Sequence, residues 1–279
     1  MLPKMLTDEK YKEVLINSLN TAIDMLQGNS KLFSTILPED LNSEYLDKND
    51  SVVSRLSHIV SKVENNNMNF NSYETSFINR AISEYIDRLE LSQSHLIYMV
   101  EDVDIENVQS MKNAIEEAFI SHMRFNAECL ENRIERNNNT EPNFNKDIVL
   151  KALANAERYV NSNSEELEFV LKDLDIKQDY TEKNNMALHA IKMTKYDIEN
   201  GSALNPAAVS IVNRAMNQYI QKLETAQSNI LYTMDGLSDL NHFKEKIKEV
   251  HFEVFKFNES YPLPSMSLGL MNRPRPPKP

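Results

Sequence analysis

The chain repeats itself. Residues 76–98 align with residues 210–232 at a constant offset of 134, and 11 of the 23 paired positions are identical. The match extends on both sides, with residues 12–30 over 146–164 at the same offset and 111–126 over 243–258 at an offset of 132. Unrelated segments of this length share far fewer identities, so the chain holds two tandem copies of one unit. This duplication limits the fold more than any other feature of the sequence.

Both copies have the composition and the periodicity of helices. The chain has 4 Gly and no Trp, whereas β-rich and phosphate-binding folds need glycine in their turns and loops. Apolar residues recur at helical spacing between polar ones, and we therefore expect an all-α protein. The expected helices cover residues 8–27, 30–37, 51–64, 74–101 and 105–134 in copy one, and 145–162, 164–174, 184–199, 206–235 and 239–257 in copy two.

The repeat also predicts the domain organisation. We expect two tandem helical bundles, copy one at residues 1–130 and copy two at 146–258, joined by a polar linker at 131–145. An extended proline-rich arm follows at 259–279. Each copy is long enough to carry its own core, and a pseudo-two-fold pair of bundles is the simplest assembly of the two.

The best-conserved segment between the copies is a long helix with polar residues beside its apolar stripe. Glu90 and Gln93 fall within about 40° of Asn79 around a helix, next to the stripe that contains Ile82. We interpret them as buried polar pairs, because buried polar groups need hydrogen-bond partners. The alternative is that they line a shared binding surface. The full set is Asn79, Glu90, Gln93, Asn213, Glu224 and Gln227.

Arginine and tyrosine side chains lie further round the same helix. Arg80 and Tyr98, with their equivalents Arg214 and Tyr232, are expected to be exposed or to contact a partner. Exposed arginine and tyrosine can anchor a protein interface, and a simple solvated face is the competing interpretation.

No motif in the sequence indicates catalysis or a cofactor. HExxH, GxGxxG, GxxxxGK[ST] and GxSxG are all absent, and His122 lies seven residues before Cys129, too far for a nucleophile–base pair. We therefore expect no catalytic, cofactor-binding or metal-binding residue, and not an enzyme. The net charge of −12 disfavours nucleic-acid binding by the body, and no run of 18 apolar residues predicts a membrane span.

The arm differs in composition from both copies. Its prolines favour extended chain, residues 266–271 are mostly apolar, and its charged residues are all basic beyond Glu259. Three interpretations stay open: a flexible end, a segment that docks on a neighbouring subunit or another protein, and a ligand for an SH3-like domain. The candidate interaction residues here are Arg273, Arg275, Pro276, Lys278 and Pro279.

These features favour a non-enzymatic structural or adaptor protein in a larger protein assembly. Its partners would be other proteins, copies of itself included, and a connector or internal protein of a phage or virus fits by analogy of layout. The expected location is the cytoplasm, or a virion assembled there. One alternative is a soluble helical effector or regulator that recruits a partner through its tail, and another is an enzyme with a site between the two copies.

Overall fold

The computed structural model describes residues 6–98, 105–134, 143–170, 174–233 and 235–260. Within these residues the chain forms eight α-helices, one short 3-10 turn and no strand, which confirms the all-α prediction. Copy one folds into α1 (Asp8–Ile36), α2 (Glu39–Glu64), α3 (Ser72–Tyr98) and α4 (Ile105–Ile134). Copy two folds into α5 (Lys146–Val170), α6 (Leu174–Glu199), α7 (Pro206–Thr233) and α8 (Leu240–Ser260), with the turn η1 (Leu237–Asp239) between α7 and α8.

The helices are fewer and longer than the sequence predicts. The break expected near Gly28 does not occur, and α1 continues to Ile36. The amide of Asn49 in α2 donates to the Leu26 carbonyl at 3.4 Å and to Ser30 Oγ at 3.2 Å, so α2 holds the helix together where it should have ended. Copy two repeats this bond, because Asn184 of α6 donates to Ser164 Oγ at 2.9 Å. Packing against the neighbouring helix therefore outweighs the weak local preference for a break near Gly28.

The third helix of each copy, α3 in copy one and α7 in copy two, has the same type of N-cap residue. Asn71 Oδ1 accepts from the Glu74 amide at 2.9 Å, and Asn205 Oδ1 accepts from the Ala208 amide at the same distance. Pro206 follows as the first helical residue, where its missing N–H costs nothing. These caps fix where α3 and α7 start, and hence the register in which the copies meet.

Each copy has its own apolar core. Leu15, Ile59, Ile82 and Phe125 lie in the core of copy one, and residues such as Leu153, Met216, Ile220 and Phe257 lie in that of copy two. A third cluster joins the copies: Leu37, at the corner between α1 and α2, packs against Leu231 and Leu240. The copies are thus interlocked and share apolar surface.

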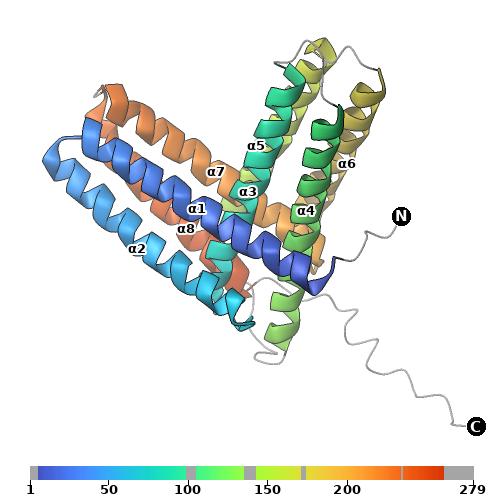
Figure 1. Ribbon diagram of the computed structural model, residues 1–279, viewed down its shortest axis with the longest axis horizontal. Helices are drawn as coiled ribbons and strands as arrows, with labels where there is room; N and C mark the ends of the chain where they lie inside the picture. The colour runs from blue at the N-terminus through green and yellow to red at the C-terminus, as the bar shows by residue number, and fades with distance from the viewer. Residues whose placement is uncertain (1–5, 99–104, 135–142, 171–173, 234, 261–279) are drawn as a thin grey trace, which may run out of the picture.

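The interlocking gives the molecule two diverging branches (Figure 1). One branch contains α1 and α2 with much of α7 and α8, and the other contains α4, α5 and α6 with part of α3. Equivalent ion pairs fasten both branches, Lys244 to Glu44 at 2.7 Å and Lys112 to Asp179 at 2.9 Å. Each branch therefore joins helices of both copies in the same way.

Candidate functional site

The long helices α3 and α7 exchange salt bridges where the copies meet. The Arg80 guanidinium donates to both carboxylate oxygens of Glu224, at 3.0 and 2.8 Å. The equivalent Arg214 donates to Glu90. Arg80 and Arg214 are equivalent positions, as are Glu90 and Glu224, so the two pairs are related by the pseudo-two-fold axis. An interface with this symmetry is isologous, like that of a two-fold dimer.

The sequence left open whether these arginines are exposed or make a contact, and in the structure both make contacts. Arg80 is half-buried and also contacts Glu84 at 2.7 Å and His251 at 2.9 Å. Burial lowers its pKa, but Glu224 and Glu84 outweigh this and raise the pKa above its ordinary value. Arg80 and Arg214 thus bind the other copy of the same chain. The side chains of Tyr98 and Tyr232 and all of residues 261–279, with Arg273, Arg275, Pro276, Lys278 and Pro279, lie outside the described part of the structure.

A cluster of buried amides lies in the same boundary. Asn258 Nδ2 donates to Asn213 Oδ1 at 2.7 Å, and Asn126 Nδ2 donates to Asn79 Oδ1 at 2.9 Å. Across the boundary, Asn258 Nδ2 lies 3.4 Å from Ser76 Oγ, and Asn126 Nδ2 lies 3.1 Å from Ser210 Oγ. All four asparagines are at most 1% exposed. The structure therefore pairs Asn79 and Asn213 inside the protein and does not present them on a surface.

Gln93 lies near the far end of α3 and Gln227 holds the equivalent place on α7. Both are buried. Gln93 donates to the Val108 carbonyl at 3.2 Å and accepts from the Tyr180 hydroxyl of copy two. Gln93 thus links α3 to both α4 and α6.

Sequence comparison of the copies could have found Asn126 and Asn258, because these two residues end the third aligned segment and are identical. The longest shared helix gives no signal for them, because they lie on α4 and α8, whereas their partners Asn79 and Asn213 lie on α3 and α7.

His122 has no counterpart in copy two, where Val254 holds the equivalent position. Its Nε2 lies 2.7 Å from Asn79 Oδ1. Because that oxygen can only accept, Nε2 carries a proton. Complete burial lowers the pKa of His122 to about 3, and the charge of Arg214 acts in the same direction.

This lowered pKa predicts a pH dependence of stability. Histidine in the unfolded chain has a pKa of ~6.5. Below that pH, His122 is protonated in the unfolded chain but stays neutral in the folded chain. Stability should fall as the pH falls from ~6.5 toward 3, by about 1.4 kcal/mol per pH unit from this group. The His122→Val variant should lose that part of the slope in urea unfolding at pH 6, 5 and 4. Equal slopes in the two proteins would contradict the assignment.

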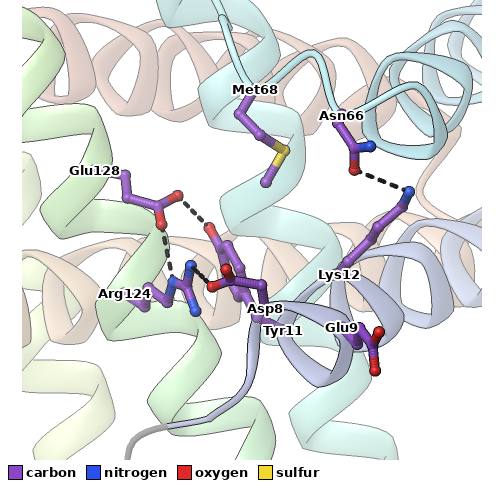
Figure 2. A pocket seen from close by; sticks show the side chains of 8 residues that line it. All are labelled: Asp8, Glu9, Tyr11, Lys12, Asn66, Met68, Arg124 and Glu128. Atoms are coloured by element: carbon purple, nitrogen blue, oxygen red, sulfur yellow. Dashed lines mark hydrogen bonds and ion pairs between the residues drawn. The ribbon is translucent and has the colours of Figure 1, made fainter.

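A shallow polar cavity of about 550 Å³ lies in copy one, between the start of α1, the α2–α3 loop and α4. Figure 2 shows that Asp8, Arg124 and Glu128 bind one another and that Lys12 binds Asn66. Arg124 contacts Asp8 at 2.6 Å and Glu128 at 2.9 Å, and Glu128 accepts from the Tyr11 hydroxyl at 2.8 Å. The sequence analysis missed this cavity, because none of these residues forms a motif.

The chemistry of this cavity favours a structural role. Burial and the neighbouring Glu128 raise the pKa of Tyr11, so the phenol stays protonated at neutral pH and is a weaker acid than a free tyrosine. Copy two replaces three of its residues, since Asn145, Lys256 and Ser260 stand where copy one has Tyr11, Arg124 and Glu128. The network fastens the start of α1 to α4.

A patch of aromatic side chains is exposed where α3 meets α8, on residues from both copies. We call Tyr73, Phe77, Phe252 and Phe255 the aromatic patch. Ring centroids lie 4.9 Å apart for Tyr73 and Phe77, 6.4 Å for Tyr73 and Phe255, and 6.5 Å for Phe252 and Phe255. Phe252 is 57% exposed and Tyr73 is 44% exposed. This surface is large and apolar for a position open to water.

Two cations flank the aromatic patch. The Arg55 guanidinium lies 5.0 Å from the Tyr73 ring centroid, and Lys256 Nζ lies 4.6 Å from that of Phe252. The pseudo-equivalent boundary between α7 and α4 has no aromatic residue at the matching positions, which are Ala207, Ile211, Ile120 and Met123. Because the patch residues differ between the copies, the repeat gave no signal for them.

Comparison with known proteins adds no assignment: no family model, no curated protein and no solved structure matches the chain. Across the described residues, His, Cys, Asp and Glu side chains form no group of three that could hold a metal ion. In that same part of the chain, every helix is too short or too polar to cross a bilayer.

Proposed function

We propose that the chain is a non-enzymatic structural or adaptor protein that assembles with copies of itself within a larger protein complex. The aromatic patch carries this proposal. Aromatic side chains and arginine are the residues that most often anchor protein interfaces, and here they lie together on a surface open to solvent. The patch combines side chains of both copies, so it exists only in the assembled pair.

The copy boundary supports the same function. The reciprocal Arg80–Glu224 and Arg214–Glu90 pairs, with the buried asparagines between them, hold α3, α4, α7 and α8 in a fixed arrangement. The arginine, glutamate and asparagine side chains named here bind one another across the boundary, which suits a rigid spacer better than a site between the copies that must admit a substrate. A rigid body presents the aromatic patch with little loss of conformational entropy on binding.

The setting that this layout suits is a connector or internal protein of a phage or virus, located in the cytoplasm or in a virion assembled there. The support is analogy of layout: an acidic helical body followed by a basic, proline-rich arm. Repeated use of one surface by identical subunits is common in such assemblies.

Light scattering of the purified full chain tests the proposal. We expect a mass above that of the 32.2 kDa single chain, and a return to the single-chain mass in the Tyr73→Ser, Phe252→Ser double variant. The loss should follow from removal of the aromatic anchors.

Leu91→Ser is the matched control, because Leu91 is a lone exposed residue on α3 with the same 57% exposure as Phe252. It should leave the mass unchanged. A single-chain mass for the unaltered protein under every buffer condition would rule the proposal out, and an oligomer that survives the double variant would exclude the aromatic patch as its contact.

A further inference from the structure

Four side chains form a second exposed surface along the outer face of α6. Met186, His189, Met193 and Tyr196 recur every three or four residues, so they share one side of the helix. We call them the α6 stripe. Met186 is 72% exposed, Met193 47% and Tyr196 60%, although methionine and tyrosine are usually buried at least in part.

The equivalent helix of copy one, α2, provides a comparison for the outer face of α6. The helix ends align at an offset of 135: the Asn65 amide donates to the Ser61 carbonyl after α2, and the Asn200 amide donates to the Tyr196 carbonyl after α6. The buried faces agree at this offset, since Ile59 corresponds to Thr194 and Val63 to Ile198. The outer residues of α2 that correspond to the α6 stripe are Ser51, Ser54, His58 and Ser61.

This comparison makes the α6 stripe a property of copy two alone. Both outer faces are exposed in the described structure, yet one is polar and the other carries two methionines and a tyrosine. A face that meets only water needs no such side chains, so the contrast indicates a contact that α6 makes and α2 does not.

Copy two is also the copy that the arm follows, and the ends of α6 and α8 both lie beside the start of α5: Gly201, just after α6, lies by Lys146 Nζ, and the Asn145 amide donates to Glu253 of α8 at 2.6 Å. Ile198, in the last turn of α6, and Phe257, in the last turn of α8, belong to the same core cluster. Ser260, the last described residue, accepts a hydrogen bond at 3.0 Å from the Asn143 amide, just before α5. Tyr196 lies two residues before Ile198, on the outer side of α6.

The chain beyond Ser260 has the length to reach the α6 stripe. The six steps from residue 260 to residue 266 span at most roughly 20 Å when extended. A helix with its side chains is about 10–12 Å across, so this length is greater than the diameter of one helix. The stripe is about 15 Å long from Tyr196 to Met186, and residues 266–271 extend over roughly 17 Å.

The side chains of the arm also match those of the α6 stripe in polarity, and its charge is opposite to that of the body. Residues 266–271 contain Met266, Leu268, Leu270 and Met271, which suit a surface of methionine and tyrosine. Residues 261–279 hold three basic and no acidic residues, which leaves residues 1–260 with 27 basic against 42 acidic residues. The arm is therefore attracted to the body as a whole.

We propose that residues 266–271 of the arm dock along the α6 stripe of the same chain. A second copy of the chain is a poorer occupant, because this narrow stripe offers far less than the ~800 Å² per partner that a stable protein interface buries. A tethered arm needs less surface, since a short linker gives an effective concentration of about millimolar. The inference does not depend on the proposed function.

Disulfide trapping in the full chain tests the docking. Met193→Cys and Leu268→Cys are combined with Cys129→Ser, which removes the single native thiol. Because a disulfide requires Cα atoms within about 7 Å, docking should give a cross-linked single chain at least about tenfold faster than in the control. The control pairs Leu268→Cys with His58→Cys, the matching position on α2. Adding Met186→Ser and Tyr196→Ser to the test variant should abolish that advantage.

Three results would overturn the proposal. Equal rates for α6 and α2 would mean that the arm does not prefer the stripe. A cross-linked dimer as the main product would mean that the arm docks on another chain. A faster reaction when Phe252→Cys replaces Met193→Cys would place the arm on the aromatic patch. A loss of assembly in the light-scattering experiment changes none of these rates, so the two proposals fail independently.

Discussion

Replacing Arg214 with methionine should lower the free energy of unfolding by about 2–3 kcal/mol at pH 7. Arg214 is 14% exposed and pairs with Asp87 at 2.9 Å and with Glu90. The methionine keeps the apolar stem over the Phe119 ring but leaves both carboxylates without their cation. Loss of one partner of a fully buried pair costs more than this, and the 40% exposure of Glu90 reduces the effect.

The pH dependence of this variant separates a charge effect from a packing effect. Burial already raises the pKa of Asp87, and Arg214 opposes that rise. Without Arg214 the folded-state pKa of Asp87 rises further above its unfolded value, so the penalty grows as the pH rises through the unfolded pKa and shrinks in acid. Urea unfolding at pH 7 and pH 4 should show a smaller loss at pH 4. A loss that is equal at both values would point to packing.

Lys183→Met is the matched control, since Lys183 is a more exposed lysine that pairs with Asp179 at 3.6 Å. Its change in the free energy of unfolding should stay within about 0.5 kcal/mol.

Replacing Asn258 with alanine should cost about 3 kcal/mol of stability. Asn258 Oδ1 accepts from Asn213 at 3.0 Å, and its amide donates to Asn213 and to the Val254 carbonyl. The alanine leaves Asn213 Oδ1 without a partner, whereas Asn213 Nδ2 keeps its bond to the Val209 carbonyl. An unmade buried hydrogen bond costs about 1–3 kcal/mol. Urea unfolding at pH 7 measures the change.

The pseudo-symmetry supplies the comparison for this second prediction. Asn126→Ala removes the equivalent residue and should cost a similar amount. Asn200→Ala removes an exposed asparagine that bonds the Tyr196 carbonyl, and its effect should stay within about 0.5 kcal/mol. If Asn258→Ala were no worse than Asn200→Ala, the buried amides would not hold the copies together.

The sequence was sufficient for what depends on local spacing. Apolar periodicity predicted the helices, and the offset of 134 predicted the repeat. The predicted break near Gly28 was wrong because the bonds that prevent it come from Asn49 on another helix. Local propensity carries no information about such a neighbour.

The site was harder to predict for a related reason. The comparison of copies singled out Asn79 and Glu90, which the structure places at the boundary. It left open whether Arg80 is exposed or makes a contact, because helical angles show which residues share a side but not which side faces the other copy. The aromatic patch and the α6 stripe differ between the copies, so a search for what the copies share passes over both.

The third cluster constrains the order in which the protein can be completed during synthesis. Leu37, at the corner of α1 and α2, is covered by Leu231 and Leu240, which are made about 190 residues later. At roughly 5–20 residues per second, that apolar corner leaves the ribosome some 10–40 s before its cover exists. The first copy therefore emerges with its corner uncovered, and the finished body forms only when the second copy has been translated.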